Sequence, residues 1–230
     1  MAIDLVLLPG LICDERLWRD VATELGQGDG AWFGDLSLDR SIGGMASRVL
    51  ATMPDRFALA GLSMGGYVAL EIMRRAPERV THLALLDTTA RPDDEARKAK
   101  RREALAAVER GEFEILARNM LAGLLAPEHL AGPLAEETQA MQLRVGEHAY
   151  VRQQTAIMDR TDSRPSLREI AVPTLVGVGE LDTLTPPDLA EEMAAGIAGA
   201  ELVVFPGSGH LSAIEAPVDV ADAMRRWLAR

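Results

Sequence analysis

Ser63 is the residue whose surroundings most directly suggest chemistry. It stands in Gly61-Leu62-Ser63-Met64-Gly65, which matches the G-x-S-x-G pattern of a nucleophilic serine on a sharp turn between a strand and a helix. Glycine is needed on both sides because the backbone there is strained and side chains would crowd the turn. An apolar strand pattern precedes the motif and a helical pattern follows it. We therefore interpret Ser63 as a nucleophile rather than as part of a glycine-rich turn.

A nucleophilic serine requires a base, and the base requires an acid that orients it. His210 is the candidate base, because it follows the last strand pattern and would lie at the same edge of the sheet as Ser63. Asp182 is the candidate acid, since the chain order serine, acid, histidine is typical of this arrangement. Asp87, at the end of another strand pattern, is a rival acid, and Glu180 is a weaker one. The remaining histidines are expected to be one structural strand residue and two solvated residues, namely His82, His129 and His148.

Acyl transfer by a serine also needs donors for the oxyanion of the tetrahedral intermediate. One donor is the backbone N–H of the residue after the nucleophile, here Met64, and the other comes from the loop after the first core strand. That loop reads LLPGLICD and nominates Leu11, with Gly10 allowing the backbone to approach closely. Cys13, in the same loop, has no base near it in the sequence and is interpreted as a small packing residue.

A parallel α/β sheet would hold these residues. Continuous apolar runs are typical of strands that are covered on both faces, and the runs are residues 3–9, 31–37 (the weakest), 56–61, 80–88, 172–179 and 200–207. Helical patterns separate them, including one after Ser63, one with Thr185 as its N-cap and a closing helix that begins at Pro217. This alternation predicts a doubly wound, mostly parallel sheet with right-handed crossovers.

More than eighty residues separate the fourth strand pattern from the fifth, several times what a strand–helix–strand connection needs. The segment has amphipathic helical patterns, so we predict a core of residues 1–90 and 171–230 with a helical cap insertion at residues 91–170. Ligands of parallel sheets bind beyond the carboxyl ends of the strands, where such an insertion would cover them. Its basic run at residues 96–103 is interpreted as a solvated helix face, with docking of an acidic carrier protein as the alternative.

Composition excludes several classes of function. The 230 residues carry a formal net charge of −11, whereas a nucleic-acid-binding protein would present a basic face. Cys13 is the only cysteine, so a reducing compartment is expected. With neither a signal-peptide pattern nor a long apolar run, the sequence predicts a cytoplasmic protein without a membrane partner. Clustered His or Cys ligand spacings do not occur, so neither a metal nor an organic cofactor is expected.

The motifs LLPGLICDERLW, GLSMGG, GELDTLTPP and GSGH occur in this order, and together they resemble the α/β-hydrolase superfamily over nearly the whole chain. The resemblance implies Ser63 as nucleophile, His210 as general base and acid, Asp182 as its orienting carboxylate, and Leu11 and Met64 as oxyanion donors. It also implies a sheet of about six strands that lacks the superfamily's N-terminal hairpin. The insertion resembles the cap of small esterases such as pimeloyl-carrier-protein methyl ester esterases and enol-lactonases.

The residues and the resemblance predict a serine hydrolase that cleaves a carboxylic ester, or a related acyl bond, of a small molecule through an acyl-enzyme. Thioesterase, lactonase and carbon–carbon hydrolase activities are alternatives, because the same groups serve each of them. A small-molecule receptor without catalysis is an alternative of a different class, since a fold does not determine a function.

Overall fold

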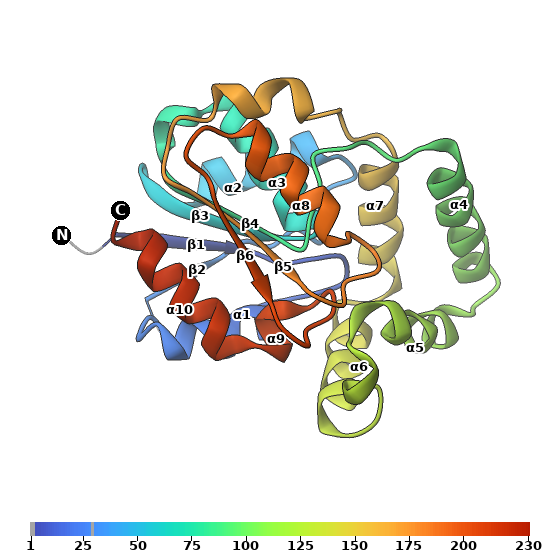
Figure 1. The fold of residues 1–230 in the computed structure, drawn as a ribbon. Helices are drawn as coiled ribbons and strands as arrows, with labels where there is room; N and C mark the ends of the chain where they lie inside the picture. The colour runs from blue at the N-terminus through green and yellow to red at the C-terminus, as the bar shows by residue number, and fades with distance from the viewer. Residues whose placement is uncertain (1–2, 29) are drawn as a thin grey trace.

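A six-stranded sheet with all strands parallel forms the centre of the protein in a computed structural model that describes residues 3–28 and 30–230 (Figure 1). The strand order is β2-β1-β3-β4-β5-β6. The strands are β1 (Leu5–Leu8), β2 (Trp32–Phe33), β3 (Phe57–Leu62), β4 (Val80–Leu86), β5 (Thr174–Gly179) and β6 (Glu201–Phe205). β1, β3 and β5 are buried along their whole length, which explains their continuously apolar sequences. The predicted parallel α/β sheet is confirmed.

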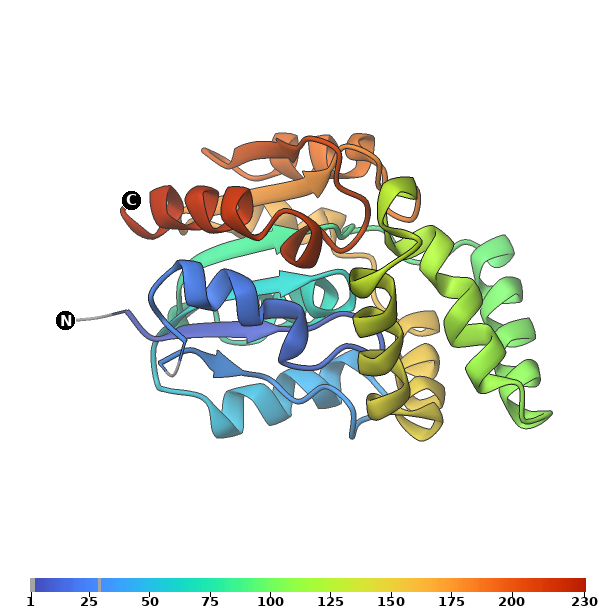
Figure 2. The ribbon, with the colours of Figure 1, turned by 90° about the horizontal axis from the view of Figure 1, so that it is seen from below.

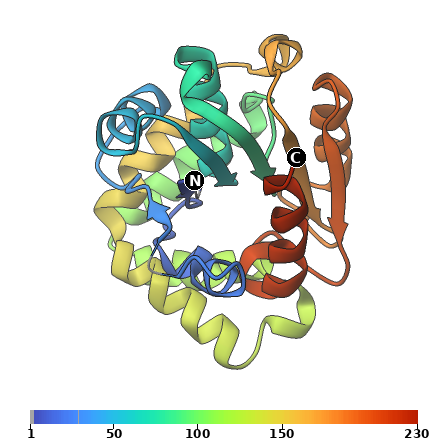
Figure 3. The ribbon, with the colours of Figure 1, turned by 90° about the vertical axis from the view of Figure 1, so that its left-hand side faces the viewer.

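Helices cover both faces of this sheet, so the fold is doubly wound (Figures 2 and 3). One face carries α1 (Arg16–Glu24), α9 (Ser212–Glu215) and α10 (Pro217–Leu228), and the other carries α2 (Ile42–Thr52), α3 (Met64–Arg75) and α8 (Pro187–Gly196). Trp18 of α1 and Trp227 of α10 are completely buried against the first face. Their indole N–H groups donate to the carbonyls of Leu8 and Pro173, so neither buried ring leaves a polar group unpaired.

The winding direction changes between β1 and β3. From β1 the chain crosses to the edge strand β2, returns past β1 to β3, and then adds β4, β5 and β6 on the other side. The loops that follow β1 and β3 therefore lead to helices on opposite faces of the sheet, and a crevice opens between them at the carboxyl ends of the strands. Gly10, after β1, and Ser63, after β3, both lie at this crevice.

Four helices lie between β4 and β5: α4 (Glu95–Glu109), α5 (Phe113–Leu124), α6 (Pro133–Val145) and α7 (Glu147–Met158). They stand beyond the carboxyl ends of the strands (Figures 1 and 2). Short 3-10 helices occupy Pro77–Arg79, Pro127–His129 and Arg164–Glu169. Arg16 of α1 binds Glu137 of α6 through two hydrogen bonds, which joins these helices to the core. Among the helices of the described residues, none is long and apolar enough to cross a membrane.

Two local predictions need correction. The run at residues 31–37 forms only the two-residue edge strand β2, where Trp32 is largely exposed. Thr185 is not a helix N-cap, because α8 begins at Pro187 after Pro186 and has no side-chain cap. The Thr185 hydroxyl donates instead to Asp182. A buried carboxylate needs donors, and Thr185 supplies one where no solvent can.

Candidate active site

Ser63 has a strained backbone at the turn between β3 and α3. Its φ of 54° and ψ of −113° lie in a region that side-chain-bearing residues rarely adopt. Three hydrogen bonds hold this conformation. The Ser63 N–H donates to the Leu86 carbonyl (2.9 Å), and the Ser63 carbonyl accepts from the Gly66 N–H (2.9 Å) and the Thr88 hydroxyl (2.7 Å). The turn is therefore anchored to the carboxyl end of β4.

The glycines around Ser63 are required by close backbone contacts. A Cβ atom at Gly61 would fall within 3 Å of the Gly65 carbonyl, and one at Gly65 would fall within 3 Å of the Leu8 and Pro9 carbonyls. Both obstacles are backbone atoms that cannot rotate away. The G-x-S-x-G pattern is thus explained by close packing within the turn at Gly61 and by packing of the turn against the end of β1 at Gly65.

His210, in the loop between β6 and α9, connects two of the predicted residues. Its Nε2 lies 2.9 Å from the Ser63 Oγ, and its Nδ1 lies 2.8 Å from the Asp182 Oδ2. If Nδ1–H donates to the carboxylate, Nε2 is left unprotonated and accepts from the serine hydroxyl. The structure therefore brings Ser63, His210 and Asp182 into one hydrogen-bonded chain. His210 is only 4% exposed.

Asp182 is buried and fully supplied with donors. Its Oδ1 accepts from the backbone N–H groups of Leu184 (2.8 Å) and Thr185 (3.0 Å), and its Oδ2 accepts from the Thr185 hydroxyl (2.7 Å) as well as from His210. Burial alone would raise the pKa of Asp182, but His210 and these donors hold that pKa below its usual value. Burial alone would lower the pKa of His210, but the carboxylate of Asp182 raises it above its usual 6.5.

Asp87 occupies a different place from Asp182. It follows β4, is completely buried, and has a positive φ of 46°. Its carboxylate accepts from the Gly179 N–H (2.8 Å) and from the Ser212 N–H and hydroxyl, with no hydrogen bond to His210. Burial, followed by the nearby charge of Asp182, raises the pKa of Asp87 to about 7. The rival acid therefore joins β5 to the first residue of α9, two residues after His210.

The other sequence candidates lie outside the hydrogen-bonded chain. The exposed Glu180 accepts from the Gly207 N–H, the half-buried His82 meets Trp227 edge-to-face, and His148 is exposed on α7. The prediction of a merely solvated His129 is wrong, because its Nδ1 lies 2.8 Å from the buried Glu215 carboxylate. Glu215 also accepts from the backbone N–H groups at 126 and 209, so it steadies the loop that carries His210. Sequence alone could not pair residues so far apart.

The two nominated oxyanion donors flank Ser63. Within the described residues, the N–H groups of Leu11 and Met64 donate to no other group of the protein. The Leu11 loop passes against the nucleophile, because a Cβ at Gly10 would lie 3.6 Å from the Ser63 Cβ. The neighbouring Ile12 N–H donates to the buried Gln153 side chain of α7 (2.8 Å), a support that the sequence did not reveal.

A cavity of about 540 Å³ opens in front of Ser63 and His210. The loop after β1, helices α4, α5 and α7, and the loop after β5 line it. Cys13 lies at its edge, and burial raises the pKa of this thiol to about 12, in keeping with a packing role rather than a reactive thiolate. Three cationic side chains of α4 also line the cavity: Arg97, Lys100 and Arg101. The prediction of a solvated helix face holds for Lys100, which is exposed, whereas Arg97 and Arg101 are half-buried.

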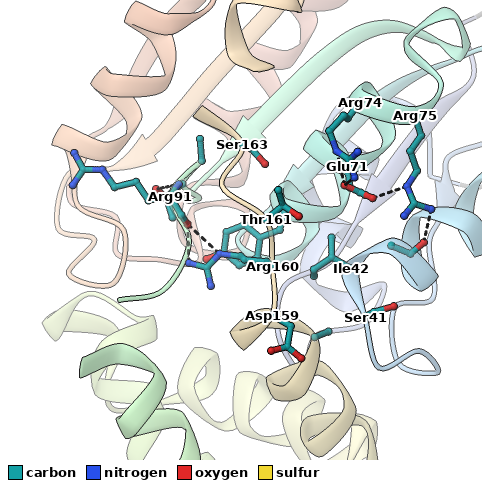
Figure 4. Close-up of a pocket in the computed structure, with 15 residues that line it drawn as sticks. Ser41, Ile42, Glu71, Arg74, Arg75, Arg91, Asp159, Arg160, Thr161 and Ser163 are labelled. Carbon is teal, nitrogen blue, oxygen red and sulfur yellow. Dashed lines mark hydrogen bonds and ion pairs between the residues drawn. The ribbon is translucent and has the colours of Figure 1, made fainter. Parts of the chain in front are cut away.

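A second, smaller cavity of about 290 Å³ lies between α2, α3 and the segment after α7 (Figure 4). It contains neither Ser63 nor His210. Its arginines pair with carboxylates, since Arg74 and Arg75 both bind Glu71. In the part of the chain that the structure describes, no three His, Cys, Asp or Glu side chains gather in a way that could hold a metal ion.

Comparison with known proteins identifies the family of the chain. The sequence profile of the "Alpha/beta hydrolase family" matches residues 5–223. The chain is 28% identical to a pimeloyl-acyl-carrier-protein methyl ester esterase of Nitrosomonas europaea, over 93% of this chain and 91% of the relative.

Solved structures show the same likeness. A thermophilic esterase from Thermogutta terrifontis, solved with malate bound, superposes with a TM-score of 0.90 at 28% identity, over 100% of this chain and 90% of that one. The enol-lactonase of Burkholderia xenovorans superposes with a TM-score of 0.86 at 20% identity, over 100% and 93%, and shares the fold.

Replacing Gly65 with alanine should destabilise the protein, because the new Cβ would meet the fixed carbonyls of Leu8 and Pro9. We expect a loss of about 2 kcal/mol or more in the free energy of unfolding, measured by urea titration. Gly123→Ala is the matched control, since Gly123 lies within helix α5 and its Cβ would make only ordinary contacts, 3.5 Å or more away. This variant should stay within about 1 kcal/mol of the parent. Equal losses in both would contradict the steric explanation.

Asp87 should make stability depend on pH. The unfolded carboxyl loses its proton near its ordinary pKa of 3.8, whereas the folded one keeps it until about 7. Over that range the folded state binds more protons, so the stability contribution of Asp87 falls as pH rises. Asp87→Asn cannot ionise. Its free energy of unfolding relative to the parent should therefore increase by about 2 kcal/mol between pH 5 and pH 8. Parallel stability curves over this interval would show that Asp87 does not titrate there.

Proposed function

The chain belongs to the alpha/beta hydrolase family, and from this premise we propose that it is a serine hydrolase that cleaves a carboxylic ester of a small molecule through an acyl-enzyme. The observation that carries the proposal is the hydrogen-bonded chain Ser63–His210–Asp182, with distances of 2.9 and 2.8 Å. Its members follow three different strands and meet at one edge of the sheet. A purely structural site would not need a strained serine beside an oriented imidazole.

In the proposed mechanism, the Ser63 Oγ attacks the carbonyl carbon of the ester while the His210 Nε2 takes the hydroxyl proton. The oxyanion that forms accepts hydrogen bonds from the unpaired N–H groups of Leu11 and Met64. His210 then gives its proton to the leaving alcohol, and an acyl-enzyme results. Water, deprotonated by His210, hydrolyses this intermediate and restores Ser63.

In the proposed mechanism, Asp182 stabilises the positive charge that His210 acquires when it takes the serine proton. A buried imidazolium is costly, and the adjacent carboxylate lowers that cost, as the raised pKa of His210 indicates. Asp182 stays ionised because three hydrogen bonds from Leu184 and Thr185, together with the imidazole of His210, favour its charged form. It therefore holds the imidazole in the tautomer that can accept the serine proton.

Esters are the favoured substrates because proteins named as esterases are among the relatives that cover nearly the whole chain. The bond named for the Nitrosomonas relative, a methyl ester on a carrier-bound acyl chain, is one candidate within this class. Thioesters and lactones would use the same groups. The α4–α7 segment would act as the cap over the site, and a cytoplasmic location stays a prediction.

Ser63→Ala should reduce the turnover of p-nitrophenyl acetate by about 10⁴-fold or more, because it removes the hydroxyl that bonds the His210 Nε2. Ser166→Ala is the matched control, since its hydroxyl bonds the Ser163 carbonyl outside the cavity. A fluorophosphonate probe should label the parent and the control but not Ser63→Ala. An unlabelled parent would favour the receptor alternative, and substantial turnover by Ser63→Ala would overturn the assignment of the nucleophile.

The acid can be identified by comparing two isosteric variants. Asp182→Asn should lower kcat by about 10³–10⁴-fold, because an amide at this place favours the wrong tautomer of His210. Asp87→Asn should stay within about tenfold of the parent, since Asp87 makes no hydrogen bond to His210. Steady-state kinetics on the same ester measures both. The opposite order of effects would assign the orienting role to Asp87.

A further inference from the structure

The charges that line the cavity in front of Ser63 are all positive. Arg97, Lys100 and Arg101 line it together with His210, and its lining includes no aspartate or glutamate. The protein as a whole has a net charge of −11, so this lining is opposite in sign to the average surface. An anionic molecule approaching the protein would be repelled on average, and only a local group of cations could make its entry favourable.

The cations come from one face of one helix. Arg97, Lys100, Arg101 and Ala104 are spaced at i, i+3, i+4 and i+7 along α4, and all four line the cavity. Within the described residues, neither Arg97 nor Lys100 pairs with a carboxylate, and the Arg97 guanidinium contacts only the Leu184 carbonyl at 3.5 Å. Their charges are therefore available to a bound molecule.

Arg101 is held in place by buried partners. Its guanidinium donates to Asp93 and to Gln154, whose side chain lies on α7. Asp93 is shared with a second buried guanidinium, that of Arg160 at 2.8 Å, so two positive charges meet one negative charge. Although burial alone would raise the pKa of Asp93, the two arginines keep it low and the carboxylate ionised. Asp93 is thus shared by two guanidinium groups, of which Arg101 lines the cavity in front of Ser63 and Arg160 lines the second cavity.

Two other cations of α4 do not belong to the cavity lining. Lys98 and Arg102 belong to the same basic run but do not line the cavity, and both pair with Glu95. The second cavity also gathers arginines, yet its lining includes the carboxylates of Glu71 and Asp159 (Figure 4). Of these two cavities, the one that holds Ser63 therefore has cations and no carboxylate in its lining.

We infer that Arg97, Lys100 and Arg101 form a carboxylate subsite, and that the preferred substrates are esters carrying a carboxylate remote from the scissile bond. The inference rests on the proposed ester hydrolysis and narrows its substrate class. A small carboxylate is favoured over an acidic carrier protein, because Arg97 and Lys100, which have no carboxylate partner within the described residues, line the cavity, while Lys98 and Arg102 lie outside its lining and share Glu95. A volume of about 540 Å³ accommodates a short dicarboxylic half ester.

The test compares charged and neutral substrates of the same shape. Monomethyl esters of straight-chain dicarboxylic acids are paired with the corresponding methyl ester amides over a graded range of chain lengths. The parent protein should have a kcat/KM about tenfold or more higher for the half ester at the best length, because an ionic hydrogen bond replaces a neutral one. Equal kcat/KM values for the acid and the amide at every length would overturn the subsite.

Two charge-matched double variants locate the effect. Arg97→Gln with Lys100→Gln should lower kcat/KM for the half ester about tenfold more than for the amide ester, and so remove most of the preference. Lys98→Gln with Arg102→Gln removes the same charge from the same helix and should keep the preference. Arg101 is left unchanged because it also forms an ion pair with the buried Asp93. If both doubles lose the preference equally, the net charge of α4 is responsible and the subsite is wrong.

Binding separates failure of the subsite from failure of the proposed function. Calorimetric titration of Ser63→Ala with the half ester and its amide requires no turnover, and the half ester should bind about tenfold tighter. Tighter binding without any hydrolysis by the parent would support the subsite and overturn the hydrolase proposal. Hydrolysis of the amide ester, together with equal or undetectable binding of both ligands, would support the hydrolase proposal and overturn the subsite. A loss confined to carrier-linked esters in the Arg97/Lys100 double would assign the cations to a carrier protein.

Discussion

The left-handed backbone of Ser63 is the constraint on which the rest of the site depends. A residue with a side chain adopts this conformation only where surrounding contacts hold it. Here the contacts come from the two strands that neighbour β3: the carbonyl of Leu86 and the hydroxyl of Thr88 belong to the end of β4 and the residues after it, and Gly65 abuts β1. The conformation of the turn therefore depends on the pairing of the central strands. This conformation directs the serine hydroxyl beyond the sheet toward His210.

Charge is distributed unevenly about His210. Behind the imidazole lie two buried carboxyl groups, Asp182 and Asp87, whose pKa values are shifted in opposite directions. Asp182 receives enough donors to stay ionised, whereas burial next to another negative charge raises the pKa of Asp87 to about 7. Ahead of the imidazole, the cavity lining carries cations and no carboxylate. This separation places negative charge where an imidazolium would form and positive charge where a substrate would lie.

Much of the fold and of the candidate site was predictable because those features are local. Continuous apolar runs marked the buried strands, and the short spacing from strand to Ser63, Asp182 or His210 placed each residue at the carboxyl end of the sheet. Contacts between distant segments were not predictable. The pairing of His129 with Glu215 and the support of Ile12 by Gln153 depend on burial, which no local pattern reports. The bond from Thr185 to Asp182 spans only three residues, but it too depends on the burial of the carboxylate. The basic run contributes Arg97, Lys100 and Arg101 to a cavity because α4 lies against α7, which its own sequence does not show.

The sequence by itself determined the elements and the chemistry that they offer: parallel strands, a serine between glycines, a histidine and acids after later strands, and a long helical segment between the fourth and fifth strands. These depend on periodicity, residue type and chain order. Only the tertiary structure decided which acid meets the imidazole, because Asp182 and Asp87 both follow strands and differ only in direction and partners. It likewise decided which cations of α4 face the cavity, because that depends on how the helix is rotated against α7 and the core.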